Sequence, residues 1–284
     1  MSTIAEPRTL SAASPRVLSE TGERHRRRAR TDRLVVTGGI IALGVAMLLI
    51  WEYAMGLVVN TRYISSPSAV VSALADQFES GDLARHVGAT MTAAGGGYLI
   101  GIAVGLGGAF LLMATRRGYE VLEPFLLAFY SIPKIALAPL FIMWFGLALT
   151  PKILLAALMV FFIVFMNTVA GVRSVDRGVI DVARVLGAGR LTLIRKILIP
   201  AAAPSIMAAV RVTFARAMVG AILAEFIAST AGLGYMIVRA ARQFDIATVF
   251  AGVIVIAVLV MLVNAAIRFL ESRLFPWASG QVAG

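Results

Sequence analysis

The sequence predicts an all-α protein that crosses a membrane six times. Of its 284 residues, 60% are hydrophobic and 14% are charged, whereas soluble domains have about 45–50% apolar and about 25% charged residues. The apolar residues also gather in runs that approach or exceed the roughly 20 residues a helix needs to cross the hydrocarbon core. The net charge of +11 comes from basic residues at the ends of these runs. This pattern orients a membrane protein and does not indicate nucleic-acid binding.

The first predicted span covers Leu34–Val59 and follows a polar, arginine-rich segment, residues 1–33. We expect that segment to be a disordered tail. It is not a cleavable signal peptide, because the apolar run behind it is long enough to span. The arginines just before the run place the N-terminus in the cytoplasm. Trp51 and Tyr53 then mark the opposite interface.

Residues 61–86 are polar, with apolar residues at helical spacing, which predicts a short amphipathic helix that lies on the outer surface or on neighbouring helices. The second span follows over about Val87–Ala114. Within it, Gly97, Gly101 and Gly105 repeat every four residues and clear one helix face. We expect another helix to pack closely against that face.

The third span, about Tyr119–Leu149, contains Pro133 and Pro139 on either side of Lys134. Proline removes a backbone hydrogen bond, so we expect a kinked helix here. A lysine deep in a membrane is costly unless it is paired or faces a polar cavity, which makes Lys134 a candidate pathway residue. If the helix breaks near Ser131 instead, Lys134 would lie close to an interface.

The fourth span begins at Pro151 and runs to about Val172, with Asn167 as its one strongly polar residue. An amide in hydrocarbon normally finds a partner on another helix. We therefore favour a structural role for Asn167 and keep a pathway role as the alternative.

The fifth span, about Ala203–Ile227, carries Arg211, Arg216 and Glu225. Arg211 is close enough to the cytoplasmic end to extend toward the surface. Arg216 is expected to face protein or a water-filled path, and Glu225 to line an external vestibule.

The segment from 229 to 245 is predicted to be an outer loop or a partial re-entrant segment, with Arg239 and Arg242 available for anions. The last span covers about Ile246–Phe269. Residues 273–284 are then a cytoplasmic tail, so both termini lie on the same side.

No catalytic set is visible in the sequence. The chain has no cysteine and two histidines, and no lysine follows a glycine, so a P-loop is excluded. We expect no catalytic residue, no metal site and no cofactor bound by this chain.

One long charged segment remains, residues 173–200, between the fourth and fifth spans. Its arginines and the count of four preceding crossings both place it in the cytoplasm. Within it, the stretch Asp181–Pro200 is rich in helix formers, and we expect a polar helix outside the bilayer.

This stretch, DVARVLGAGRLTLIRKILIP, resembles the "EAA" signature of bacterial ABC importer permeases: Glu-Ala-Ala, three residues, Gly, nine residues, Ile-x-Leu-Pro. The spacing fits without gaps, and three positions depart conservatively. The matching positions are Asp181, Val182, Ala183, Gly187, Ile197, Ile199 and Pro200, of which Asp181, Val182 and Ile199 are the departures.

The likeness extends over roughly residues 60–272. SIPKIALAPLFIMWFGL (131–147), NTVAGVRSVD (167–176) and AEFIASTAGLGYMI (224–237) look like permeases of the nitrate, sulfonate and taurine type. The resemblance implies a type I ABC importer permease (MetI-like) core over residues 34–272. It also implies a multi-pass location in the bacterial cytoplasmic membrane.

The resemblance further implies a homodimer in membrane lipid, two cytoplasmic ATPase subunits that bind ATP and Mg, and an external substrate-binding protein. A coupling helix within residues 176–200 would dock on each ATPase, with Gly187 allowing a tight bend. The implied coupling residues are Asp181, Val182, Ala183, Arg184, Leu186, Gly187, Ala188, Ile197 and Pro200.

The implied cargo is a small anion such as a sulfonate, taurine or nitrate, while aromatic carboxylates and vitamin precursors stay open. One alternative is a secondary transporter or channel driven by an ion gradient. It would require internal repeats and an intramembrane carboxylate relay, whereas only Glu225 is seen. A membrane enzyme ranks third because no catalytic set is visible.

Overall fold

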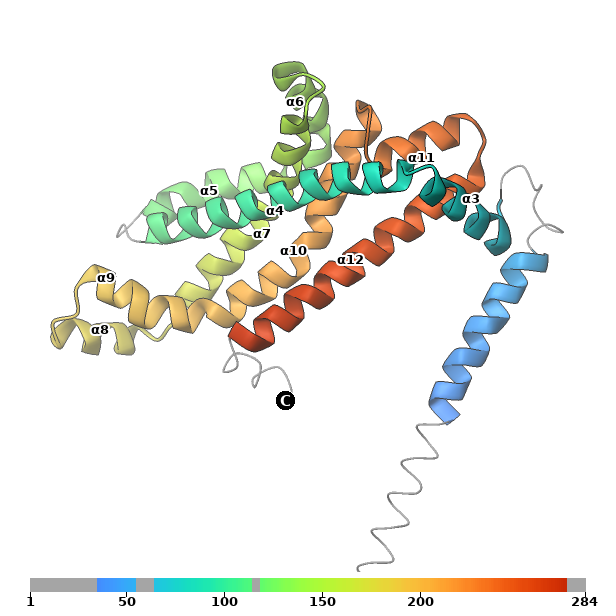
Figure 1. Cartoon of the computed structure of the whole chain (residues 1–284). Helices are drawn as coiled ribbons and strands as arrows, with labels where there is room; N and C mark the ends of the chain where they lie inside the picture. Colours follow the sequence, from blue (N-terminus) through green and yellow to red (C-terminus); the bar gives the residue numbers. More distant parts are fainter. Residues whose placement is uncertain (1–34, 55–63, 114–117, 275–284) are drawn as a thin grey trace, which may run out of the picture. The chain divides into compact units, whose positions relative to one another are not determined.

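The computed structural model of the protein describes residues 35–54, 64–113 and 118–274 (Figure 1). They belong to two compact units, residues 1–61 and 62–284. Every regular element in the described ranges is a helix, as predicted. The expected tail at residues 1–33 and most of the one at 273–284 lie outside the described residues.

The first unit contributes one apolar helix, Val35–Tyr53, whose last turn is the π-helical η1 (Ile50–Ala54). Its 19 residues are long enough to span a bilayer. None of its apolar side chains is buried within the described part of the protein. The helix agrees with the predicted first span, whose last five residues lie outside the described ranges.

The second unit begins with α3 (Pro67–Glu79), capped by Ser66, whose hydroxyl accepts a hydrogen bond from the Ala69 N–H at 3.3 Å. The chain turns at Gly81 and enters α4 (Asp82–Met113). The predicted boundary between the amphipathic helix and the second span was therefore wrong. The polar residues 82–86 form the first turn of the long helix, where Asp82 lies near the positive end of its dipole.

α4 packs closely along α7 (Leu149–Arg173), and the glycines of α4 make this possible. A Cβ atom at Gly97 would overlap the Cβ of Ala156. One at Gly101 would lie 2.7 Å from the Ala157 carbonyl oxygen, and one at Gly105 would lie 3.1 Å from that of Phe161. The predicted close approach at this face is confirmed.

α10 (Ile199–Ile227) completes a three-helix core with α4 and α7. Small side chains dominate the contact, and a Cβ at Gly220 would lie 2.8 Å from the Ala156 Cα. The Tyr98 hydroxyl donates a hydrogen bond to the Val210 carbonyl at 2.9 Å, and its ring meets Phe214 edge-on. Close backbones with few, satisfied polar groups are typical of helix packing in membranes.

The third span is broken near Ser131, which the sequence interpretation gave as the alternative to a kinked helix. α5 (Gly118–Ser131) is followed by the 3-10 turn η2 (Lys134–Leu137) and by α6 (Ala138–Phe145), with an 81° bend between the two halves. Pro133 stands at the break, but Pro139 lies in the first turn of α6, where a missing N–H costs nothing. The span also ends at Phe145, and Leu149 already begins α7.

Beyond α10 the chain forms α11 (Leu233–Arg242) and α12 (Ile246–Leu274). The outer loop predicted for 229–245 was wrong for most of its length, because ten of these residues form the amphipathic helix α11, while the alternative of a partial re-entrant segment stays a prediction. The described part thus holds five single helices and one bent pair with the length and composition of membrane spans, which agrees with the six predicted crossings.

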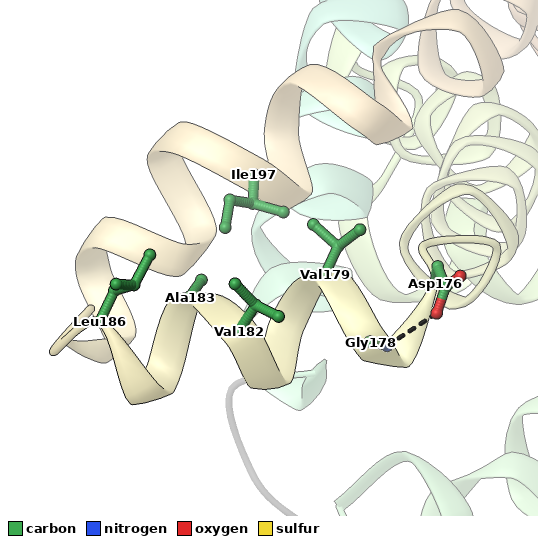
Figure 2. Close-up of a pocket in the computed structure, with 7 residues that line it drawn as sticks. All are labelled: Asp176, Gly178, Val179, Val182, Ala183, Leu186 and Ile197. Carbon is green, nitrogen blue, oxygen red and sulfur yellow. Dashed lines mark hydrogen bonds between the residues drawn. The ribbon is translucent and has the colours of Figure 1, made fainter.

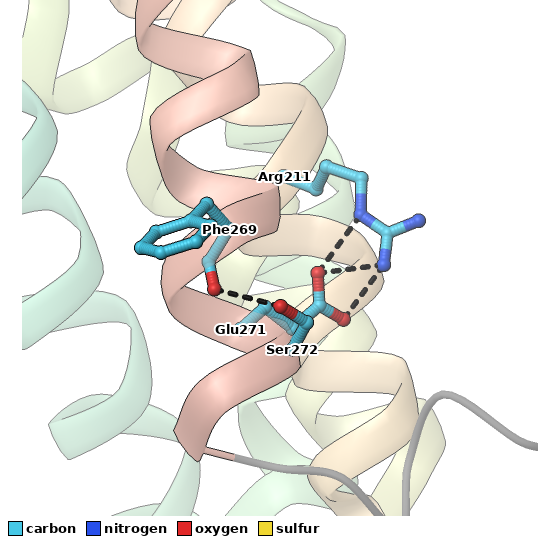
Figure 3. Close-up of polar contacts among 4 residues, drawn as sticks. All are labelled: Arg211, Phe269, Glu271 and Ser272. Carbon is cyan, nitrogen blue, oxygen red and sulfur yellow. Dashed lines mark hydrogen bonds and ion pairs between the residues drawn. The ribbon is translucent and has the colours of Figure 1, made fainter.

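An ion pair ties α10 to the end of α12 (Figure 3). The Arg211 Nη2 lies 2.6 Å from Oε1 of Glu271, and its Nε lies 3.1 Å from Oε2. The Glu271 side chain is 8% exposed and that of Arg211 is 38% exposed. Arg211 therefore has a carboxylate partner within the protein, which the sequence interpretation did not identify.

Candidate functional site

The charged segment between α7 and α10 forms two helical segments joined by a turn. α8 (Arg177–Val185) is followed by that turn, by α9 (Arg190–Leu193) and by the π-helical η3 (Ile194–Leu198), which runs into α10. The helix expected within residues 176–200, with its bend at Gly187, corresponds to α8 and the turn after it. Asp176 starts α8, since its Oδ1 accepts a hydrogen bond from the Gly178 N–H at 2.7 Å.

The turn after α8 is a Schellman motif centred on Gly187. The Gly187 N–H donates to the Arg184 carbonyl, and the Ala188 N–H donates to the Ala183 carbonyl, both at 2.9 Å. This motif needs a left-handed residue after the helix, and Gly187 has φ of +83°. The predicted bend at Gly187 is confirmed, and it explains why α8 ends here and does not continue toward Pro200.

Four predicted coupling residues line one open hollow of about 530 Å³ between α8 and η3, namely Val182, Ala183, Leu186 and Ile197 (Figure 2). Ile197 extends from η3 toward α8, and the remaining lining residues are Asp176, Gly178 and Val179. Val182 and Leu186 are 61% and 81% exposed. The surface is therefore apolar and open at a position where the flanking sequence is charged.

The other predicted coupling residues surround the hollow without lining it. Asp181 and Arg184 form an ion pair at 3.3 Å on the exposed side of α8. Both side chains are well over half exposed, and such pairs contribute about 0–1 kcal/mol. Pro200 lies in the first turn of α10.

The six predicted pathway residues are not brought together. Lys134 lies at the break between α5 and α6, where its Nζ donates to the Tyr130 carbonyl at 2.6 Å. The same nitrogen lies 4.3 Å from the Tyr130 ring centre and 4.9 Å from that of Phe162. The lysine thus satisfies a carbonyl near the break and gains two cation–π contacts.

Asn167 bonds within its own helix. Its Nδ2 donates to the Ile163 carbonyl at 2.8 Å, so the expected partner on another helix was wrong. Arg216 on α10 is exposed, as are Arg239 and Arg242 on α11. Within the described ranges no hydrogen bond or ion pair joins any two of these six residues, and no cluster of three potential metal ligands occurs.

Glu225 does not line an open vestibule in this structure. It is 1% exposed, and its carboxylate accepts hydrogen bonds from the Thr90 hydroxyl and the Gly234 N–H. Lys152 on α7 and His86 on α4 are also buried, and both contact the turn between α10 and α11. The sequence interpretation did not single out Thr90 or Lys152. The one available signal was a lysine and a glutamate inside apolar runs, which indicates paired groups in a membrane protein.

Comparison with known proteins agrees with this architecture. Residues 97–276 match the family described as "Binding-protein-dependent transport system inner membrane component". The chain is 36% identical to the putative aliphatic sulfonates transport permease protein SsuC of Bacillus subtilis, over 84% of this chain and 86% of that protein. It is 31% identical to the formylaminopyrimidine transport permease protein ThiX of Halalkalibacterium halodurans, over 83% of this chain and 94% of that protein.

The fold has a counterpart among solved structures. A chain of a bacterial ABC transporter involved in the import of the acidic polysaccharide alginate superposes with a TM-score of 0.58 at 17% identity, covering 88% of this chain and 99% of that one. The family match covers more than half of the chain, and the sequence relatives cover most of it. The chain therefore belongs to the family of binding-protein-dependent transport system inner membrane components and is the inner-membrane permease of an ABC importer.

Proposed function

We propose that two copies of this chain form the translocation pathway of an ATP-driven importer, and that each copy docks on a separate ATPase subunit through α8 and the turn at Gly187. ATP and Mg bind to the ATPase, and an external binding protein delivers the substrate. Family membership supports this arrangement, and it does not favour a transporter driven by an ion gradient alone.

The observation that carries the docking proposal is the exposed apolar end of α8. Val182, Val185 and Leu186 are 61%, 87% and 81% exposed, beside the open hollow that Ile197 closes on one side. Burying a side chain of this kind contributes about 1.5–3 kcal/mol. A cleft on a partner protein that receives this end of α8 would therefore gain substantial binding energy.

The same region is well connected to the core. From Arg190 to Ile227 the chain is one helical span of 38 residues, so α9, η3 and α10 are continuous. The Schellman turn joins α8 to this span through hydrogen-bonded backbone. A displacement of α8 by the ATPase would pass directly into α10, which packs on α4 and α7. Two docked helices moving together would bias the pathway between inward-facing and outward-facing states.

For the substrate we propose a small anion, with an organic sulfonate as the first choice over taurine or nitrate. The exposed arginines of α10 and α11 and the lysine at the broken span supply positive charge without an ion-pair partner among the described residues: Lys134, Arg216, Arg239 and Arg242. The B. subtilis relative is named for aliphatic sulfonates, but the H. halodurans relative is named for a formylaminopyrimidine. Selection would then rest mainly on the external binding protein.

We place both termini in the cytoplasm, together with α8. The basic residues that precede the first span and those of the segment 173–200 support this orientation.

The docking proposal is tested by Gly187→Glu against Gly189→Glu. Both positions have open space around a new Cβ, but only Gly187 has a positive φ. Gly187→Glu should strain the Schellman turn and place a charge beside Leu186, so the ATPase should fail to co-purify and ATP-driven uptake should be lost. Gly189→Glu adds the same charge with no backbone strain and should retain most uptake. Normal uptake by Gly187→Glu would contradict the docking site.

A further inference from the structure

The turn that joins α10 to α11, residues 229–234, is held by side chains from three other places in the fold. It follows Glu225 by a few residues and leads into the first turn of α11. Turns of this kind usually satisfy their polar groups with water. Here residues 232–234 are buried, so their backbone groups need partners within the protein.

Three consecutive N–H groups at the end of this turn each have a side-chain acceptor. The Gly232 N–H donates to Nδ1 of His86 at 3.1 Å, the Leu233 N–H to Oγ1 of Thr90 at 2.7 Å, and the Gly234 N–H to Oε2 of Glu225 at 2.8 Å. These are the N–H groups at the start of α11, which have no acceptor inside that helix. α4 and α10 therefore cap α11 from outside, and a carboxylate lies near the positive end of its dipole.

The carbonyl side of the turn is met by a cation. Lys152 on α7 is 7% exposed, and its Nζ donates to Oγ of Ser229 at 2.6 Å and to the Ala231 carbonyl at 3.1 Å. Lys152 and Glu225 thus contact the same turn from α7 and α10, the lysine at a carbonyl group and the glutamate at an N–H group.

There is no space for a substrate at Glu225. Thr90 is fully buried, and its hydroxyl lies 2.9 Å and 3.0 Å from the two carboxylate oxygens. A Cβ atom added at Gly232 would overlap the Glu225 carboxyl group, and one added at Gly234 would lie 2.8 Å from the Glu225 Cβ. The backbone of the turn is therefore pressed directly onto the glutamate.

We infer that Thr90, Lys152 and Glu225 form a clamp that holds α11 on α4, α7 and α10, so that these four helices move as one unit during transport. In this α11 clamp, Glu225 is a positioning residue that never contacts substrate. The inference rests on the proposed transport function for its second test below, but its first test is independent of it.

The first test compares Thr90→Val with Thr90→Ser in the purified full-length chain, by hydrogen–deuterium exchange at the backbone of 232–242. Valine keeps the shape of threonine but removes the hydroxyl, while serine keeps the hydroxyl. Thr90→Val should speed exchange in this segment about tenfold, equivalent to about 1.4 kcal/mol. Thr90→Ser should exchange like the unmodified chain, and α7 should be unchanged in both. Equal exchange in all three proteins would overturn the clamp.

The second test measures ATP-driven uptake of ethanesulfonate and of taurine by the complete transporter. Thr90→Val and Glu225→Gln should lower the maximal rates for both compounds by the same factor. This factor should be about fivefold to tenfold, because each variant weakens a hydrogen bond worth near 1 kcal/mol. The KM values should stay unchanged, and Thr90→Ser should restore the rate. A changed KM or a changed preference between the two compounds in Glu225→Gln alone would make Glu225 a substrate contact and overturn the inference.

Failure of the proposed function has a different signature. The unmodified chain would then show no ATP-dependent uptake of either compound, while the exchange experiment would still decide for or against the clamp.

Discussion

Two glycine turns stand at opposite ends of the α9–α10 span, and they solve opposite problems (Figure 1). Gly187 turns the chain after α8 with nothing within 4 Å of a new Cβ, and the apolar side chains around it are exposed. Gly232 turns the chain before α11 against the buried carboxylate of Glu225. Both have positive φ, but Gly232, with φ of +128° and ψ of 161°, lies in a region that only glycine adopts readily. The surroundings differ as well: the open apolar turn leaves side chains available to a partner protein, whereas the buried polar turn has its partners within the chain.

The largest expected effect separates the two turns directly. Gly232→Ala should destabilise the protein by more than about 3 kcal/mol, because φ of +128° is unfavourable for alanine and its Cβ would overlap a buried charged group. Gly187→Ala has only the backbone penalty, about 1 kcal/mol, since its Cβ meets no atom. Thermal unfolding of the two variants in the same detergent measures the difference. Similar melting temperatures would show that the surroundings of the two turns do not matter.

A second substitution tests whether the open turn serves a partner. Leu186→Asp should leave the stability of the isolated chain within about 0.5 kcal/mol of the original, because this side chain is 81% exposed. It should weaken ATPase binding by roughly tenfold to a hundredfold, the equivalent of losing about 1.5–3 kcal/mol of apolar burial. Leu186→Met keeps an apolar side chain and serves as the control. Unfolding of Leu186→Asp by itself would mean that Leu186 packs within the chain.

The smallest effect is expected at the exposed ion pair on α8. Asp181→Asn removes a pair whose side chains are 69% and 63% exposed, so stability should change by less than about 1 kcal/mol. If Asp181 meets a cation on the ATPase, Asn will weaken docking at low salt. The weakening should fade in high salt, because the screening length falls to about 3 Å at 1 M. A loss of docking that persists in high salt would point to a shape requirement instead of a charge.

The sequence interpretation succeeded where the signal is local. Gly97, Gly101 and Gly105 are four residues apart, so their common face follows from helix geometry, and the packing against α7 confirms it. The bend at Gly187 was also predictable, because a glycine that follows a helix commonly ends it.

The errors concern residues whose environment is made by distant parts of the chain. Glu225 and Thr90 are 135 positions apart, and no periodicity in either segment indicates that they meet. The segment 229–245 contains two glycines near its start, which favoured a loop. In the structure these glycines lie at the start of α11. Side-chain acceptors on α4 and α10 bind the N–H groups there and stabilise α11.

The sequence by itself determined the membrane location, the number of crossings, the glycine face of α4 and the position of the turn at Gly187. These depend on composition, run length and backbone conformation, which are properties of neighbouring residues. The tertiary structure alone decided which charged groups are open and which are enclosed. Glu225, Lys152 and Arg211 each bring an ionisable side chain into an apolar run, yet their partners come from distant parts of the chain. A charge in a membrane protein is tolerated where packing brings it a partner, and packing is a property of the whole chain.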